Sequence, residues 1–160
     1  MKKITVITVG VLTLLGLYAC DNNINKVFDG QTLVEFNDAI LRTNATGRTF
    51  SITSVPNSVT AGGTVVAQLN LVGAQRSSDL TVRVLPDPAF TTAAATNYSL
   101  VNGGNVVIPA NTSFGSLTMV VSRASSATAS VGNVVLVVDS TSADFKPSQN
   151  YKRLGYSFRQ

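Results

Sequence analysis

The stretch VVAQLNL at residues 65–71 decides the fold class of this chain. Its odd-numbered positions are apolar, whereas Gln68 and Asn70 stand at even-numbered positions. Because the side chains of a β-strand point alternately to opposite faces of a sheet, this pattern predicts a strand with one buried face and one mixed face. The same alternation recurs at residues 80–84 and 116–122, so the signal is not confined to one segment.

Two further segments near the C-terminus complete the strand pattern. Residues 134–138 are unbroken apolar, which indicates a central strand covered on both faces. Residues 153–159 alternate again and are expected to close the sheet. Turn residues separate these runs at spacings of roughly 10 to 20 residues, which is typical of a sandwich. The sequence therefore predicts an all-β sandwich of about seven to eight strands.

Three segments carry more local expectations. Residues 32–41 fit a strand or a short helix, and we favour the strand. The Asn-Gly-Gly sequence at residues 102–104 tolerates positive φ, so it predicts a hairpin turn between the apolar segments on either side. The alanine-rich residues 92–96 and 124–130 are expected to be loops.

The N-terminal residues are typical of an export signal. Lys2 and Lys3 precede an apolar run from Ile4 to Leu17, which is too short for a membrane-spanning helix of roughly 20 residues. A positive start, a short apolar centre and a small residue before the cleavage point define a secretory signal peptide. The chain contains one cysteine, Cys20, and it lies where such a signal ends.

The sequence LYAC at residues 17–20 resembles the lipobox of bacterial lipoproteins at three of its four positions, the tyrosine being the departure. The resemblance implies a lipoprotein signal peptide at residues 1–19 and a Cys20 that is lipidated on its thiol and acylated on its amino group. Cys20 and the flexible polar tether that follows it make up residues 20–26. Several acyl chains give durable membrane attachment, at about 0.8 kcal/mol per buried methylene. An ordinary signal peptide with a chance cysteine is the alternative. Residues 27–160 then form a single β-sandwich domain.

Two resemblances refine the expected fold. Residues 91–98, 107–110 and 117–121 resemble, in this order, the Thr-Ala segment and the two following strands of Calx-β-like and related immunoglobulin-like modules. Together with the lipobox, residues 78–82 and 144–147 resemble small Bacteroidota lipoproteins of unknown function built on one such domain. The resemblance implies an immunoglobulin-like, antiparallel sandwich. It says little about function, because one sandwich architecture carries many roles.

Calcium is the ligand that the Calx-β resemblance brings into question. Calcium-binding members place several carboxylates in loops at one end of the sandwich, and calcium takes about six to eight oxygen ligands. Here an asparagine, Asn97, stands where that family has an aspartate. The candidate carboxylates of the sandwich are Asp79, Asp87, Asp139 and Asp144. We expect no bound metal and no cofactor, and we keep a calcium-dependent adhesion domain as an alternative.

Side chains that commonly carry catalysis are scarce. The chain has no histidine and its one cysteine is that of the lipobox, which excludes Ser-His-Asp and Cys-His nucleophiles. Asp139 and Asp144 are the nearest carboxylate pair for glycoside cleavage, but the serines and threonine between them favour a solvated turn. Residues 139–141 also resemble a short O-glycosylation motif of some Bacteroidota, and there too we favour a turn. We expect a protein that is not an enzyme, with a small carboxylate hydrolase as an alternative.

Charge and aromatic content limit the ligand classes. The formal net charge of +4 falls to +2 once Lys2 and Lys3 leave with the signal peptide. The remaining basic residues are dispersed, whereas nucleic-acid binding needs a clustered basic stripe. Exposed aromatic rings could stack on sugars, and the tyrosines beyond the leader are Tyr98, Tyr151 and Tyr156. We expect Tyr156 in the core and Tyr98 packed at a corner of the sandwich.

The sequence thus predicts a non-catalytic lipoprotein of the cell envelope that binds or spaces through its loops or an exposed sheet face. A protein or a glycan is the expected ligand, and nucleic acid is not. An accessory role in nutrient uptake or adhesion fits such a module. We expect the anchor to lie in the outer membrane, with the domain on its periplasmic or its outer face.

Overall fold

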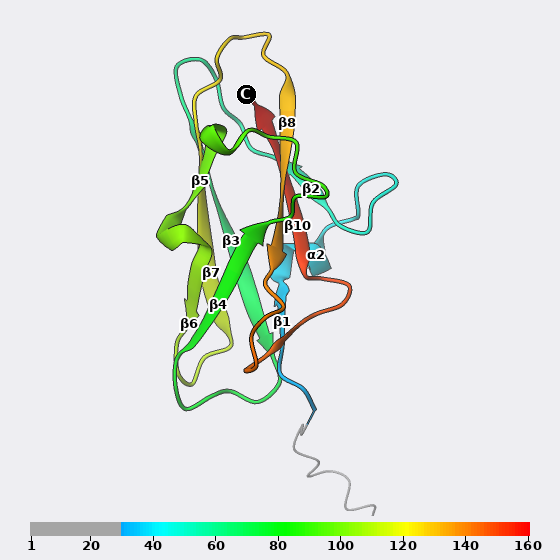
Figure 1. Cartoon of the computed structure of the whole chain (residues 1–160), viewed down its shortest axis with the longest axis vertical. Coiled ribbons are helices and arrows are strands. Elements are labelled where there is room, and N and C mark those ends of the chain that lie inside the picture. Colours follow the sequence, from blue (N-terminus) through cyan, green and yellow to red (C-terminus); the bar gives the residue numbers. More distant parts are fainter. Residues whose placement is uncertain (1–29) are drawn as a thin grey trace, which may run out of the picture.

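The described part of the chain forms a sandwich of two five-stranded sheets (Figure 1). The computed structural model describes residues 30–160. The strands are β1 (Leu33–Phe36), β2 (Ile52–Ser54), β3 (Gly63–Val72), β4 (Leu80–Pro86), β5 (Tyr98–Leu100), β6 (Asn105–Ile108), β7 (Phe114–Val121), β8 (Val131–Val138), β9 (Lys146–Pro147) and β10 (Arg153–Arg159). Three short helices join them: α2 (Asn37–Leu41), η2 (Ala95–Asn97) and η3 (Val101–Gly104).

The strand order confirms the all-β, immunoglobulin-like prediction. One sheet has the order β5-β7-β3-β1-β9, and the other has the order β2-β10-β8-β4-β6. The first contains the four-stranded sheet of an immunoglobulin constant domain and the second its three-stranded partner. Two details differ from the prediction. Ten strands are present within the described residues, and three of them, β2, β5 and β9, are only two or three residues long. In addition, β1 pairs with β9 and β2 pairs with β10 in parallel.

The inward-facing residues of the alternating segments form the core. Leu69 and Leu117 of the first sheet, and Val82 and Leu154 of the second, are 3% exposed or less. Each such side chain contributes about 1.5–3 kcal/mol through burial. The segments predicted as long strands are found as β3, β4, β7, β8 and β10. Strand β8 lies at the centre of its sheet, and its run Val134–Leu136 is fully buried, as expected for a strand covered on both faces.

The opening segment is half strand and half helix. Strand β1 ends at Phe36, and residues 37–41 then form α2, so the preference for a strand over all of residues 32–41 was wrong in its second half. Asp38 stands in the first turn of this helix, where a carboxylate is favoured. Ala39 is buried in the core, which fixes the helix against the sandwich.

The hairpin predicted at residues 102–104 was wrong, because this turn crosses between the sheets. Its preceding strand β5 pairs with β7, and its following strand β6 pairs with β4 in the other sheet. The positive φ values expected for the turn are present, 54° at Asn102 and 63° at Gly103. A Cβ on Gly104 would lie 2.2 Å from the carbonyl oxygen of Val84, so the crossing brings two backbones into direct contact. The two alanine-rich segments are irregular as expected, apart from the single turn η2.

The two tyrosines assigned from sequence lie as predicted. Tyr156 is 1% exposed, and burial raises the pKa of its hydroxyl well above the usual 10.0, with the nearby Asp38 charge raising it further and Arg42 lowering it. Within residues 30–160 that hydroxyl has no hydrogen-bond partner. Tyr98 packs edge-on against Phe158, with ring centroids 6.3 Å apart, and partial burial raises its pKa as well.

Candidate functional site

A hollow of about 500 Å³ opens beside the start of β10. One wall is the segment between α2 and β2, and the other is the loop that leads from β9 into β10. Both segments project from the same side of the sandwich (Figure 1). The lining residues are Asn44, Thr49, Gln149, Asn150, Tyr151, Lys152 and Arg153. We refer to this site as the Tyr151 hollow.

Backbone hydrogen bonds give both walls a defined shape. In the first wall the Ala45 N–H donates to the Phe50 carbonyl at 3.0 Å, and the Arg48 N–H donates to the Ala45 carbonyl at 2.9 Å. Phe50 is buried, so this wall is attached to the core. In the second wall the Tyr151 carbonyl accepts a bond of 3.0 Å from the Phe36 N–H at the end of β1. Each wall therefore has a fixed point close to the hollow.

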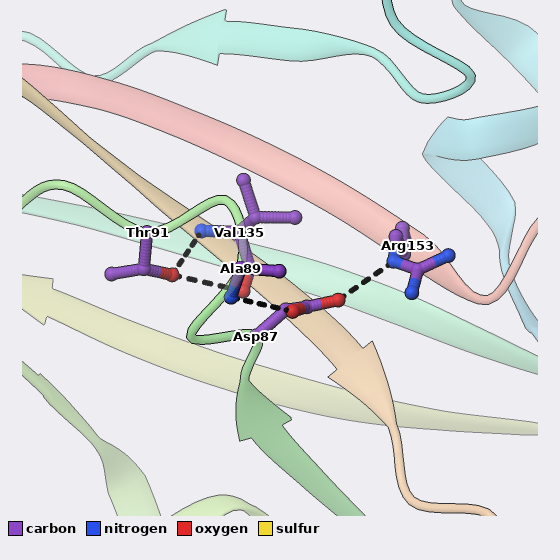
Figure 2. A network of polar contacts seen from close by, with 5 residues as sticks. All are labelled: Asp87, Ala89, Thr91, Val135 and Arg153. Atoms are coloured by element: carbon purple, nitrogen blue, oxygen red, sulfur yellow. Dashed lines mark hydrogen bonds and ion pairs between the residues drawn. The ribbon is translucent and has the colours of Figure 1, made fainter.

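Arg153 is held in place by a partly buried polar network (Figure 2). Its Nε donates to Oδ2 of Asp87 at 2.8 Å, and Oδ1 of Asp87 accepts from the Ala89 N–H at 3.0 Å. The Asp87 side chain is only 8% exposed, whereas that of Arg153 is 30% exposed. The backbone N–H of Asp87 donates to the Val135 carbonyl. Asp87 thus connects β8, the chain after β4 and the first residue of β10.

The chain beyond Asp87 stays beside β8 although the regular ladder has ended at Pro86. The N–H of Val135 donates to the Thr91 hydroxyl at 3.1 Å, and the N–H of Asn133 donates to the Thr92 hydroxyl at 3.0 Å. The Thr92 N–H returns a bond of 2.7 Å to the Asn133 carbonyl. Threonine side chains therefore replace backbone partners here, which satisfies buried N–H groups of the central strand.

Phe90 brings two arginines from distant segments to one aromatic ring. The guanidinium carbon of Arg153 lies 5.4 Å from the ring centroid, and that of Arg48 lies 5.5 Å from it. Such contacts contribute about 0.5–1 kcal/mol each at exposed sites. The ring itself packs edge-on against Phe50 with centroids 5.1 Å apart. Arg153, which lines the hollow, therefore contacts a ring that packs against a buried aromatic residue.

The lining of the Tyr151 hollow combines an aromatic ring with amides and cations. Tyr151 is 38% exposed, so part of its ring is open to solvent. Asn44, Gln149 and Asn150 each carry an amide that can both donate and accept hydrogen bonds. Small-molecule sites typically join an apolar or aromatic surface with a few well-placed polar groups. No carboxylate is among the residues that line this hollow.

A second exposed aromatic lies on the outer face of the first sheet. Phe114 is 58% exposed and is the register partner of Asn70 on β3. A row of amides runs beside it, in which Gln68 donates to Asn70 at 2.8 Å and Asn70 donates to Asn37 at 3.2 Å. These four residues form an outer-sheet surface that combines an exposed aromatic ring with amides. It is therefore a competing candidate for a sugar-binding site.

The four aspartates considered for calcium are engaged separately. Asp79 and Asp139 accept backbone N–H bonds of 2.8 and 3.0 Å, Asp144 forms a surface ion pair at 3.3 Å, and Asp87 belongs to the network already described. In residues 30–160 no group of three or more Asp, Glu, His or Cys side chains could hold a metal ion. The residues present therefore do not fit the calcium site of the Calx-β resemblance.

Neither member of the carboxylate pair considered for hydrolysis lines the Tyr151 hollow, although Asp139 lines a neighbouring pocket together with Lys152 and Arg153. Asp139 and Asp144 both belong to the irregular segment between β8 and β9. Asp139 closes a local turn by accepting the Thr141 N–H, and Asp144 pairs with Arg76. The solvated loop expected for this segment agrees with these contacts.

The lipidation site predicted at Cys20, the signal peptide and the tether lie outside the described residues. Across residues 30–160, no helix combines the length and the apolar character that crossing a bilayer requires.

Sequence reasoning did not find the Tyr151 hollow. Arg153 and Asp87 are 66 residues apart, and their contact depends on strand order that no local pattern encodes. The adjacent pair Lys152 and Arg153 was the one visible trace. It was interpreted as part of a dispersed set of charges. In the sequence, the position of Asp87 between Pro86 and Pro88 indicates only the end of a strand.

Comparisons with known proteins support the fold. No protein-family model and no curated protein matches the sequence. The chain is similar in structure, at 12% identity and a TM-score of 0.50, to a candidate carbohydrate binding protein from Bacteroides ovatus, covering 68% of this chain and 34% of that one. It is similar, at 12% identity and a TM-score of 0.51, to EndoBT-3987 from Bacteroides thetaiotaomicron, solved with a Man5GlcNAc product, covering 79% of this chain and 30% of that one. The chain thus spans about a third of the length of each.

Proposed function

We propose that this protein is a non-catalytic, carbohydrate-binding lipoprotein of the cell envelope that holds its glycan in the Tyr151 hollow. The observation that carries the proposal is the combination of one exposed ring, three amides and two cations around about 500 Å³. A sugar offers C–H faces that suit an aromatic ring and hydroxyl groups that suit amides, which both donate and accept.

The two similar structures support the ligand class. One is a candidate carbohydrate binding protein, and the other was solved with a Man5GlcNAc product. Because the chain spans only about a third of each, their ligands do not transfer to it by similarity. The proposal that this chain binds a glycan therefore rests on the side chains that line the hollow.

A binding role is favoured over hydrolysis by the distribution of carboxylates. Glycoside cleavage ordinarily needs two carboxyl groups that flank the scissile bond. The Tyr151 hollow is lined by none, and Asp139 and Asp144 lie in the loop between β8 and β9. The absence of histidine from the chain removes the most frequent general base.

Attachment through acylated Cys20 would hold this domain at the outer membrane, where it could serve nutrient uptake or adhesion. This part of the proposal rests on the lipobox resemblance at residues 17–20. Its test is detergent phase separation, in which the wild-type protein should enter the detergent phase and Cys20→Ser should leave it. If both variants partition alike, the anchor is wrong even where the glycan-binding role is right.

The test of the ligand is a glycan array probed with the full chain in a non-ionic detergent. Replacing Tyr151 by Ala should weaken the best glycan by about tenfold or more, as expected for an aromatic hot-spot residue. Phe114→Ala is the matched control, since it removes another exposed ring from the outer-sheet surface. Both variants should keep the wild-type melting temperature within about 3 °C, because the two rings are solvent-exposed.

The outcomes separate the candidate sites. Loss of binding in Tyr151→Ala but not in Phe114→Ala supports the proposal. The opposite pattern moves the site to the outer-sheet surface and overturns the assignment to the hollow. Binding to no glycan on the array contradicts the carbohydrate-binding function itself.

A further inference from the structure

The lining of the Tyr151 hollow contains two cations and no carboxylate. Lys152 and Arg153 line the hollow, and Arg48 contacts the same Phe90 ring as Arg153; within residues 30–160, Asp87 is the one carboxylate bonded to any of these three cations. The ion pairs found within residues 30–160 include Arg153 but neither Arg48 nor Lys152. Lys152 in the lining and Arg48 beside Phe90 thus form no ion pair in the described part of the chain, although Asp139 lines a neighbouring pocket with Lys152.

Arg153 presents one edge of its guanidinium in a fixed orientation. The Nε edge is used by Asp87, which is itself fixed by the Ala89 N–H. Figure 2 shows one terminal nitrogen on the far side of the guanidinium from the Asp87 carboxylate, and in residues 30–160 neither terminal nitrogen has a hydrogen-bond partner. A guanidinium edge of this kind matches the two oxygens of a carboxylate or a sulfate in a bidentate contact.

Phe90 adds a second reason for an anion. Its ring holds the guanidinium groups of Arg48 and Arg153, each within 5.5 Å of the ring centroid. Two cations near one ring repel each other, and the attraction of both to a nearby anion would offset that repulsion. Lys152, which lines the hollow next to Arg153, would add to the attraction.

We propose that the glycan bound in the Tyr151 hollow is acidic, and that its carboxylate or sulfate is held by the terminal nitrogens of Arg153, with Arg48 and Lys152 adding electrostatic attraction. This inference rests on the proposed function, because it assigns the ligand class of the same hollow. The amides and Tyr151 bind the neutral part of the sugar. The arginine edge selects the charge.

The experiment compares matched glycans on the full chain in a non-ionic detergent. Each neutral glycan is paired with a form that carries a carboxylate, as sialate or uronate, and with a form that carries a sulfate. We expect one acidic form to bind at least about tenfold more tightly than its neutral parent. Raising the salt concentration from about 50 to about 500 mM should remove most of that difference in affinity, because a higher ionic strength screens electrostatic attraction. Which acidic form prevails identifies the source of the anion.

Three variants locate the effect. Lys152→Gln and Arg48→Gln each remove a cation that forms no ion pair within residues 30–160, and each should lower the acidic-to-neutral affinity ratio about threefold. Arg153→Lys keeps the charge but loses the bidentate edge, so the acidic-to-neutral affinity ratio should fall about tenfold. Arg123→Gln is the matched control, because Arg123 follows β7 and lies near the C-terminal end of β10, opposite Arg153.

The failures of the two proposals are distinguishable. If neutral and acidic glycans bind equally and the ratio is the same in all variants, the acidic preference is refuted while the carbohydrate-binding function stands. An equal loss in Arg123→Gln and Lys152→Gln would show a general charge effect and overturn the local site. If no glycan of any class binds, the proposed function fails and this inference fails with it.

Discussion

Asp87 offers the sharpest test of how the site is built into the fold. Replacing it with Ala removes a carboxylate that is 8% exposed and that accepts bonds from the Ala89 N–H and from Nε of Arg153. Replacing it with Asn keeps an oxygen for the Ala89 N–H but removes the charge that faces Arg153. The two variants therefore separate the turn from the ion pair.

The expected magnitudes follow from these contacts. The Ala89 bond is worth about 1 kcal/mol, and a charge-assisted bond is worth about 1.5–3 kcal/mol when it is dry. Because Arg153 is 30% exposed, we reduce its contribution to about 1–2 kcal/mol. Asp87→Ala should thus lower the free energy of unfolding by about 2–3 kcal/mol, and Asp87→Asn by about 1–2 kcal/mol. For a domain of this size the first value lowers the melting temperature by roughly 10 °C.

Urea unfolding followed by far-ultraviolet circular dichroism measures these changes, since the chain has no tryptophan. The Cys20→Ser background, which lacks the thiol of the proposed lipid anchor, is used so that the measurement needs no detergent. Asp144→Ala is the control, because the Asp144 side chain is 63% exposed in its 3.3 Å ion pair and should contribute less than about 0.5 kcal/mol. Equal stability of Asp87→Ala and Asp144→Ala would refute the structural role of the network.

The remaining predictions use the same unfolding assay. Gly103→Ala should cost about 1 kcal/mol for its positive φ, whereas Gly104→Ala should cost about 3 kcal/mol or more because its Cβ meets backbone; equal losses would contradict the close inter-sheet crossing. Asn57→Ala should cost about 2 kcal/mol, since its amide makes three hydrogen bonds to backbone groups of two other segments; a loss below about 0.5 kcal/mol would argue against them. Tyr156→Phe removes a buried hydroxyl and should leave stability at pH 8 unchanged or raised by about 1 kcal/mol. Above pH 10 the unfolded chain ionises this tyrosine while the folded chain keeps it protonated, so the wild type should lose up to about 1.4 kcal/mol per pH unit more than the variant; parallel pH profiles would contradict the raised pKa.

The long strands were predictable because their information is local. Each alternating segment states which side chains face the core, and the buried positions of β3, β4, β7 and β10 follow that alternation. The unbroken apolar run of β8 likewise indicated its central place. Prolines and glycines marked where ladders end. These signals depend on neighbouring residues alone, so they need no knowledge of which strands pair.

Strand pairing and the site were not predictable for the complementary reason. The Asn-Gly-Gly turn at residues 102–104 has the same composition whether it closes a hairpin or crosses between sheets, and only the pairing of β5 with β7 decides. The contact between Asp87 and Arg153 depends on β8 lying between β4 and β10. Asp87, a polar residue directly after a strand, indicates only a turn in the sequence, whereas in the fold it binds Arg153 of another strand.

The division of labour within the Tyr151 hollow follows from where its residues are mounted. Arg153 is the first residue of β10 and is held by Asp87, which follows β4 directly, so its charged edge is placed by strands. Asn44 and Asn150 stand in irregular segments, which can adapt their amides to different hydroxyl patterns. A site built this way fixes the position of the anion and leaves the sugar geometry adjustable. Substitutions in the two loops should therefore change which sugars bind while the preference for acidic over neutral forms persists, whereas Arg153→Lys should weaken that preference across all sugars alike.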